Sequence, residues 1–179
     1  MSATATMPAS FQLVGSMNPC PCGFAGSATT FCRCSGAALG RYARRVSGPL
    51  LDRFDLRLRV EPTDGARLLG AAAGESSAVV AERVAAARER ARSRGVAVNR
   101  LLSNRRLDEL TTVDDTARVL LEDAIAAGRL SGRGLRRIKL VALTLDDLRG
   151  GSGRLDDEVV AQAMALRADL RFGEIGVGA

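Results

Sequence analysis

The sequence predicts a mainly helical protein in which a short α/β part precedes a larger all-helical part. Aromatic residues make up only 3% of the 179 residues although 46% are hydrophobic, so the core must be built from Leu, Val and Ala, a composition that favours helices. Two strand-like apolar runs both lie before residue 62. Beyond them, apolar residues recur at helical spacing between capping residues and glycines.

The first strand-like run is Phe11 to Met17, which the pattern predicts to be a short buried strand. It leads directly into Asn18-Pro19, a turn signal. Open α/β sheets carry ligand-contacting residues at the carboxyl ends of their strands. We therefore expect Asn18 at the tip of this strand to contact a ligand, and a simple Asx turn is the alternative interpretation.

Between residues 20 and 34 the chain carries two cysteine pairs separated by nine residues. Such a layout can gather four thiolates tetrahedrally around zinc, and the Gly/Ser/Thr-rich loop between the pairs has little apolar content to hold it otherwise. With four protein ligands, such a zinc would be structural. Free thiols are the alternative, and disulfides are disfavoured in a cytosolic protein. The predicted ligands are Cys20, Cys22, Cys32 and Cys34.

Ser35 is expected to cap a helix that runs to about Val46. The stretch from Ser47 to Leu56 follows and places Arg53 between two acids after a Gly-Pro turn, so this arginine should be held rigidly at a surface. A buried ion pair of Arg53 with Asp52 or Asp55 is the local alternative. Leu56, Leu58 and Val60 then alternate with charged residues, which predicts a half-buried strand stopped by Pro62.

After a Gly/Ala-rich linker, the remaining chain reads as helices. In the first of them we expect Val79, Val80, Val84 and Ala87 to face inward and Arg83, Arg90 and Arg94 to face outward. A basic cluster near the start of the fourth helix opposes the helix dipole, which invites a functional explanation or marks only a solvated face. The helices are expected from Ser76 or Ser77 to Gly95, around Leu101 to Leu110, from a Thr112 cap to Gly128, from a Ser131 cap to Gly150, and from Leu155 to Leu170; the basic residues are Arg133, Arg136, Arg137 and Lys139.

Charge and composition exclude some functions. The absence of histidine rules out a Ser-His-Asp triad, a His general base and His metal ligands. The net charge is +6, and every cation except Lys139 is an arginine, which suits phosphate or an acidic partner; a coding bias toward arginine explains the same excess. The first ten residues show no signal-peptide pattern and no run reaches membrane-spanning length, so a cytoplasmic protein without membrane contact is expected.

Several spaced motifs together resemble the magnesium-chelatase-like AAA+ ATPases of the ComM or YifB type. They follow the family's order from Phe11 onward, which is more specific than any one of them. The motifs are Phe11 to Val14, Asn18 to Gly23, Cys32 to Cys34, Ser47 to Leu56, Gly74 to Ser77, Arg83 to Glu89, and Leu130 to Arg133.

The resemblance implies a hexameric ring ATPase that uses ATP with Mg²⁺ at sites between subunits. Asn18 is similar to the sensor 1 residue that orients the attacking water, and Arg53 to the arginine finger that reaches a neighbouring subunit's site. Arg133 is similar to the sensor 2 arginine of the helical lid. The implied domains are the C-terminal part of the AAA+ core at residues 1–62, a linker at 63–75 and the lid at 76–179.

The chain departs from the family pattern because no Walker A or Walker B segment is present. Its sole lysine, Lys139, follows no glycine-rich loop. We therefore interpret the chain as the C-terminal portion of an ATPase that neither binds ATP tightly nor hydrolyses it alone. A truncated chain, a split gene, a misassigned start at Met1 and a degenerate relative are the alternatives for its origin.

The family resemblance implies DNA-bound hexamers that drive branch migration during recombination in natural transformation. Two alternatives stay open. One is a non-catalytic module that lends Arg53 to a Walker-containing partner chain, and the other is a magnesium chelatase subunit. The second ranks last because the paired cysteines beside Asn18 resemble the ComM branch. Arginines that could contact a DNA backbone are Arg83, Arg90, Arg92, Arg94, Arg136 and Arg137.

Overall fold

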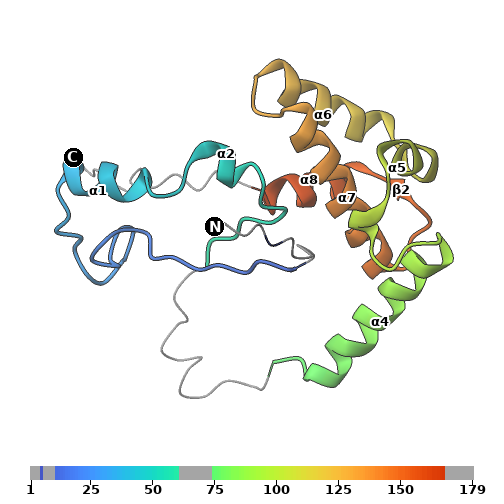
Figure 1. The fold of residues 1–179 in the computed structure, drawn as a ribbon, viewed down its shortest axis with the longest axis horizontal. Helices are drawn as coiled ribbons and strands as arrows, with labels where there is room; N and C mark the ends of the chain where they lie inside the picture. Colours follow the sequence, from blue (N-terminus) through green and yellow to red (C-terminus); the bar gives the residue numbers. More distant parts are fainter. Residues whose placement is uncertain (1–4, 6–10, 61–73, 168–179) are drawn as a thin grey trace. The chain divides into compact units, whose positions relative to one another are not determined.

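The computed structural model describes residue 5 and residues 11–60 and 74–167, which fall into two compact units. Unit 1 comprises the described residues up to Ser47, and unit 2 comprises the described residues from Gly48 onward. Helices make up most of unit 2, whereas the described residues of unit 1 contain one helix (Figure 1). The predicted domain division at residues 63–75 falls largely outside the described residues and stays a prediction.

Unit 1 contains the helix α1 (Gly36–Ala43), which begins where the sequence predicts. The hydroxyl oxygen of Ser35 accepts a hydrogen bond from the Ala38 N–H at 3.3 Å, so the predicted N-cap is confirmed. Leu39 and Tyr42 are half-buried on one face. The helix ends at Ala43 instead of Val46.

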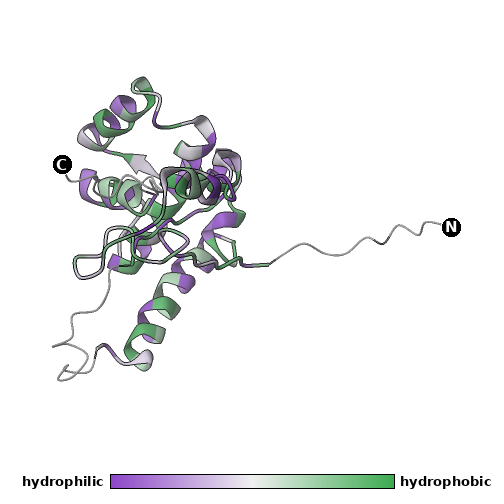
Figure 2. Cartoon of the chain, turned by 90° about the vertical axis from the view of Figure 1, so that its left-hand side faces the viewer, coloured by the Kyte–Doolittle hydropathy of each residue, from purple (hydrophilic) through white to green (hydrophobic). Residues whose placement is uncertain are grey.

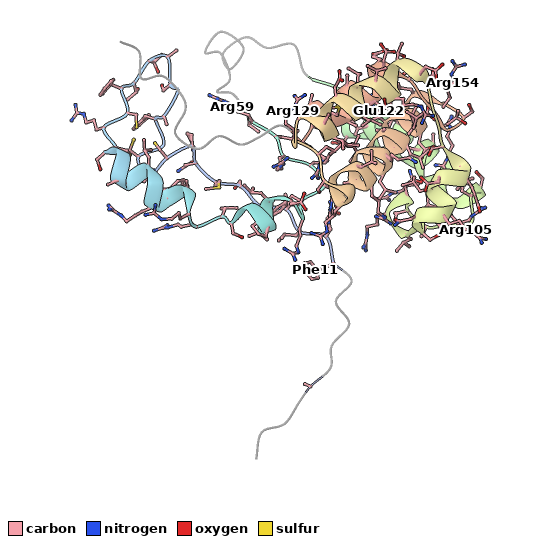
Figure 3. The ribbon with its side chains drawn as sticks, turned by 90° about the horizontal axis from the view of Figure 1, so that it is seen from above. Phe11, Arg59, Arg105, Glu122, Arg129 and Arg154 are labelled. Atoms are coloured by element: carbon pink, nitrogen blue, oxygen red, sulfur yellow. The ribbon has the colours of Figure 1, made fainter. Side chains whose placement is uncertain are left out.

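The predicted strand from Phe11 to Met17 is wrong for this structure. The segment has no regular secondary structure, and the side chains of Phe11 and Val14 are 71% and 82% exposed. Figure 3 labels Phe11 on this extended segment. A strand is stabilised by ladder hydrogen bonds to a neighbour, and the described residues of unit 1 contain no other strand to provide them.

The predicted strand after the arginine motif is also wrong. Unit 2 begins with the short helix α2 (Gly48–Leu51), followed by a turn and an extended segment to Val60. Leu56, Leu58 and Val60 are exposed and Arg57 is half-buried, so the apolar residues do not form the expected buried face. Instead of pairing with a strand, the Arg57 N–H donates to the carbonyl of Leu166 at 2.7 Å.

The rest of unit 2 is built from helices and one short strand pair. Four of the helices begin at a side chain that accepts a hydrogen bond from a backbone N–H of the first turn: Ser76, Ser103, Ser131 and Asp156. Figure 2 shows that these helices carry both apolar and polar residues. The elements are α4 (Ser77–Ser93), η1 (Asn99–Leu101), α5 (Asn104–Leu110), β1 (Thr112–Val113), α6 (Asp115–Ala126), α7 (Gly132–Arg149), β2 (Arg154–Leu155) and α8 (Asp157–Ala165).

The strands β1 and β2 correct the expectation of an all-helical second part. They pair in parallel, and Thr112 lies in β1 instead of capping α6, whose N-cap is Asp114. The Thr112 N–H donates to the Gly153 carbonyl at 3.0 Å and the Asp114 N–H to the Leu155 carbonyl at 3.1 Å. Two residues are too few to produce a strand periodicity in the sequence, so only the folded chain reveals the pair.

The hydrophobic core of unit 2 surrounds α7, which packs against α4, α5, α8, η1 and β2. Aliphatic side chains alone form this core, as the composition requires. No helix in the described part of the chain is both long enough and apolar enough to cross a membrane. The core residues with the least exposure are Leu107, Ala117, Ala142, Leu143, Leu155, Val160 and Ala163.

The inward face of α4 differs from the predicted one. Val79 and Val80 are exposed, whereas Ala87 and Ala91 are buried. Arg94, expected outside, forms an ion pair with Asp147 of α7; the two side chains are 13% and 1% exposed.

Asp147 also binds two other parts of this region. Its Oδ2 accepts from the Asn99 amide at 2.7 Å, and its backbone carbonyl accepts from Arg90 at 3.1 Å. The small alanines allow α4 to approach α7 closely enough for its arginines to reach this buried acid.

Asp147→Asn should lower the free energy of unfolding by about 3 kcal/mol, because it leaves the Arg94 charge without its buried partner. Glu89→Gln provides a matched control, since the exposed Arg92–Glu89 pair is worth about 0.5 kcal/mol or less. Urea unfolding followed by circular dichroism measures both variants. Equal effects of the two substitutions would show that the Arg94–Asp147 pair contributes no more than a surface contact.

Candidate metal centre and arginine cluster

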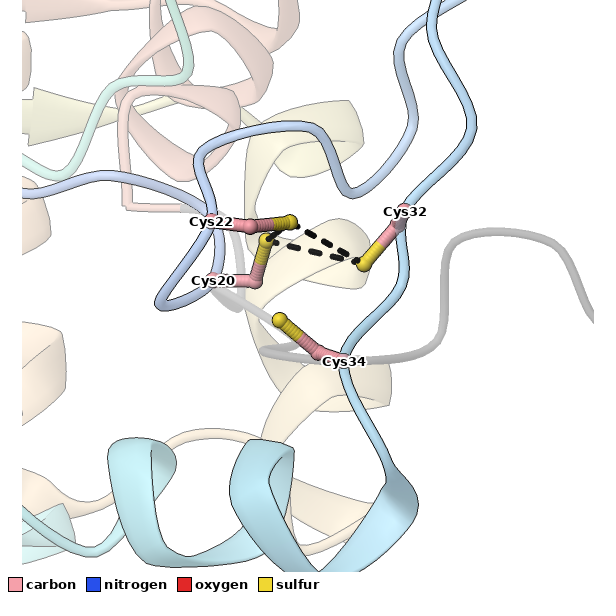
Figure 4. A group of neighbouring side chains, drawn as sticks. All are labelled: Cys20, Cys22, Cys32 and Cys34. Atoms are coloured by element: carbon pink, nitrogen blue, oxygen red, sulfur yellow. Dashed lines mark hydrogen bonds between the residues drawn. The ribbon is translucent and has the colours of Figure 1, made fainter.

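The four predicted cysteine ligands lie together in unit 1. The Sγ atoms of Cys20 and Cys22 are 3.4 Å apart, and Cys32 Sγ lies 3.7 Å from the first and 3.6 Å from the second (Figure 4). All four Sγ atoms, including that of Cys34, lie within 4.8 Å of one another. Four thiolates at about 2.3 Å from a zinc ion stand about 3.8 Å from each other in a tetrahedron. The arrangement therefore fits a structural Cys₄ zinc site, and no disulfide joins these residues.

A tight turn holds the first cysteine pair. The Gly23 N–H donates to the Cys20 carbonyl at 3.0 Å, and Gly23 has a φ of 85°, in the left-handed region that favours glycine. The Ala25 N–H donates to Cys20 Sγ at 3.3 Å, and both residues are buried. These backbone contacts hold the Cys20 sulfur in position beside the other three.

The electrostatics of the four thiols are unequal. The Phe24 backbone N–H and the Cys20 thiol lower the pKa of Cys22 to about 6. For Cys34, the Cys22 backbone N–H acts to lower the pKa, but desolvation and the three neighbouring thiols outweigh it and raise the pKa to about 12. The Cys34 N–H likewise lowers the pKa of Cys32, and desolvation with the neighbouring thiols reverses this to a net increase. Thiols crowded in this way favour a cation that compensates their charge.

Asn18 lies in unit 1, directly before the cysteine centre. It is exposed, and its backbone carbonyl accepts a hydrogen bond from the Tyr42 hydroxyl of α1 at 3.0 Å. Arg53 and Arg133, the other two predicted site residues, belong to unit 2.

Arg53 follows α2 in the turn before the extended segment. Its guanidinium donates to the Pro49 carbonyl at 2.8 Å, and the residue is exposed. Neither flanking acid pairs with it among the described residues. Asp52 instead forms an ion pair with Arg133 at 3.4 Å, and Asp55 pairs with Arg137. The alternative interpretation of Arg53 as a buried partner of these acids is therefore wrong.

Arg133 and the basic residues that follow it differ in their surroundings. The side chain of Arg133 is 59% exposed. Arg136 donates to the Leu102 carbonyl at 2.7 Å, and Lys139 pairs with Asp108 of α5. Local ion pairs and hydrogen bonds thus compensate much of the unfavourable positive charge at the start of α7.

Two arginines that the sequence interpretation missed hold the segment around Arg53. Arg167, only 6% exposed, donates to the carbonyls of Phe54 and Asp55, the latter at 3.2 Å. In return, Arg57 donates to the carbonyl of Arg167. Burial, with the nearby charges of Arg57 and Arg137, lowers the pKa of Arg167. The sequence carried one indication that Arg167 faces inward: it lies four residues after the buried Ala163, and residues at this spacing share a helix face.

Many other arginines lie on the outside of unit 2 in local pairs. Figure 3 labels Arg105 and Arg154 there; Arg154 binds Asp114 at 2.9 Å and Arg105 binds Glu109 at 3.1 Å. The Asp114 carboxylate raises the pKa of Arg154 through hydrogen bonds and charge. Such exposed pairs contribute little to stability.

Comparison with known proteins identifies the family of this chain. Residues 1–68 match the family model described as magnesium chelatase, subunit ChlI, and residues 74–167 match the model of the C-terminal region of the same subunit. The chain therefore belongs to the magnesium chelatase family.

Within this family the chain is of the ComM and YifB type. It is 36% identical to the competence protein ComM of Haemophilus influenzae over 96% of this chain and 33% of that protein. It is 38% identical to the uncharacterized protein YifB of Escherichia coli over 82% of this chain and 29% of that protein. An uncharacterized protein of Mycobacterium tuberculosis is 41% identical over 88% of this chain and 31% of its own length. The chain thus spans about a third of the length of these relatives.

Zinc content tests the metal centre directly. Protein purified with zinc under reducing conditions should contain about one zinc per chain by elemental analysis, and Cys32→Ser should lower this content because it removes a thiolate ligand. Ser16→Ala, outside the cysteine centre, is the control and should retain the metal. Less than about half a zinc per chain in the wild-type protein would favour free thiols.

Zinc affinity should rise with pH. In the metal-free chain the raised pKa values of Cys32 and Cys34 keep both thiols protonated at pH 8, whereas Cys22, with a pKa of about 6, is already a thiolate. Binding at pH 8 must therefore release about two protons or more per zinc. Calorimetry in buffers of different ionisation enthalpy counts these protons. Zinc binding without proton release would contradict the thiol assignments.

Proposed function

We propose that this chain supplies the arginine finger, the sensors and the helical lid of a ring-shaped AAA+ ATPase of the ComM type. In this proposal Arg53 reaches the nucleotide of a neighbouring subunit and neutralises charge as the γ-phosphate is transferred. Asn18 orients the attacking water, and Arg133 contacts phosphate from the lid. Phosphoryl transfer depends mainly on such positioned charge.

The exposure of Arg53 is the observation that supports this proposal most. The flanking acids Asp52 and Asp55 pair with Arg133 and Arg137, and within the described residues the Arg53 guanidinium donates only to the Pro49 carbonyl. A guanidinium without a carboxylate partner keeps its charge available for a phosphate. Arg167 nevertheless holds the backbone of the segment that carries Arg53, so the position from which the finger extends is fixed.

The nucleotide in this proposal is ATP with Mg²⁺, held by Walker motifs on another polypeptide segment. The sole lysine cannot serve as a Walker lysine here, because Lys139 lies within α7 and pairs with Asp108. Zinc bound by the four cysteines would hold the loop after Asn18 and leaves the chemistry to other residues.

The same features support the alternative of a non-catalytic module that lends Arg53 to a partner chain. The apolar side chains of residues 11–17 and 56–60 are exposed, in segments whose sequences favour strands. Strands of a partner polypeptide could pair with these segments and cover them. Both versions require a Walker-containing neighbour and differ in whether that neighbour is the same gene product.

DNA is the proposed substrate of the assembled ATPase, and branch migration in recombination and natural transformation its proposed role. The name of the relative ComM, a competence protein, supports this role. Of the arginines proposed for DNA-backbone contacts, Arg94 is unsuited because its side chain is only 13% exposed and pairs with Asp147. Arg83 and Arg92 stay exposed, each in a surface ion pair that a phosphate could replace.

Mixing this chain with the Walker-containing segment of a ComM-type protein should give ATP hydrolysis that DNA stimulates, whereas this chain alone should hydrolyse none. Arg53→Ala should lower the turnover number by about a thousandfold or more, because a finger arginine contributes that much to the rate. Arg105→Ala, an exposed arginine of α5, is the control and should keep wild-type turnover. Unchanged turnover in Arg53→Ala would refute the finger assignment, and turnover by this chain alone would refute its dependence on a partner.

A further inference from the structure

Tyr42 connects the helix after the cysteine centre to the residue before it. Its hydroxyl donates to the Asn18 carbonyl at 3.0 Å, across 24 residues of sequence. The guanidinium of Arg45 lies 5.8 Å from the centroid of the Tyr42 ring, and the ring is half-buried. A cation over an aromatic face holds the ring in place.

The path from Asn18 to Tyr42 runs through the four cysteines. Cys20 follows Asn18 by two residues, and Cys34 immediately precedes Ser35, the N-cap of α1. Drawing the two cysteine pairs together therefore brings the start of α1 close to the 18–20 segment. The eight residues of α1 are rigid enough to carry this placement to Tyr42.

Asn18 has few other constraints on its backbone. Pro19 disfavours the helical region for the residue before it, and Pro19 has no N–H of its own to hydrogen-bond. The position of the Asn18 carbonyl is thus set by Cys20 on one side and by the Tyr42 hydroxyl on the other. The Asn18 amide nitrogen lies only 3.9 Å from the point where a Cβ on Gly23 would stand, so the turn of the cysteine centre leaves room for this side chain.

We propose that the metal-loaded cysteine centre positions Asn18, and that Tyr42 is the positioning residue through which it does so. Zinc closes the loop, α1 follows, and the Tyr42 hydroxyl fixes the peptide plane from which the Asn18 side chain extends. An effect of this coupling on ATP hydrolysis rests on the proposed function, in which Asn18 orients the attacking water. The coupling between zinc and the Tyr42–Asn18 bond does not depend on that role.

The composition allows a direct measurement, because Tyr42 is the only tyrosine and the chain has no tryptophan. Adding Zn²⁺ to the reduced, metal-free chain should change the tyrosine emission and saturate at one equivalent. Tyr42→Phe should weaken zinc binding about two- to tenfold, the effect of one net hydrogen bond formed with the metal-bound state. A competing chelator of known affinity measures this without using tyrosine emission.

Thr30→Val is the matched control for the loss of a hydroxyl. Thr30 is an exposed loop residue two positions before Cys32, and its hydroxyl makes no hydrogen bond within the described residues. This variant should bind zinc as the wild-type chain does. Equal zinc affinity in Tyr42→Phe and wild type would overturn the coupling. Tyrosine emission that does not change when zinc is added would overturn it as well.

The consequence for catalysis is tested in the assembled ATPase. Tyr42→Phe should lower kcat about two- to tenfold with little change in KM, and should lower it no further when Asn18→Ala is present, because Tyr42 acts through Asn18. An equal loss in both backgrounds would show that Tyr42 acts elsewhere. Unchanged turnover in Asn18→Ala alone would refute the proposed role of Asn18, while the zinc measurements would still decide the coupling.

Discussion

Two adjacent buried acids of α7, Asp146 and Asp147, hold the neighbouring parts of unit 2 in place. Successive residues on a helix point in different directions, so the two carboxylates reach different neighbours. Asp147 binds Arg94 and Asn99, and Asp146 Oδ2 accepts from the Gly153 N–H at 2.7 Å. A Cβ on Gly151 would stand 1.8 Å from Asp146 Oδ1, so a larger residue there would displace this carboxylate. Because a buried carboxylate is costly without partners, these contacts fix both α4 and the loop that leads to β2.

The same need for partners explains the surroundings of Arg53. Polar contacts hold the segment that carries it to the helices of unit 2, among them Asp52 with Arg133, Asp55 with Arg137, and backbone carbonyls with Arg167. These arginines occupy the acids that flank Arg53. A motif that places one arginine between two acids therefore presents that arginine outward, because the folded chain supplies other arginines for the acids.

Unit 1 has no core of comparable size among its described residues. Its buried apolar residues there are Cys20 and Ala25, so hydrophobic burial contributes little to holding the loop. The cysteine centre, the Ser35 cap and the Tyr42–Asn18 hydrogen bond are the contacts that define it. In small units of this kind, bound metal commonly supplies the stability that a core would otherwise give. Because so few contacts define the described part of unit 1, a change at the cysteine centre is expected to reach Asn18.

The sequence by itself determined the features that depend on near neighbours along the chain. The caps at Ser35, Ser76 and Ser131, the helix end at Gly95 and the gathering of the four cysteines all involve residues within a few turns or one loop.

Only the tertiary structure decided that the described apolar runs at 11–17 and 56–60 form no strand, that Thr112 enters a strand, and that Arg94 and Arg167 turn inward. Arg94 meets Asp147 across 53 residues, and Arg167 meets Phe54 across 113. Periodicity and capping signals report interactions over about four residues, whereas a strand ladder or a buried ion pair depends on a partner that distant parts of the chain must supply.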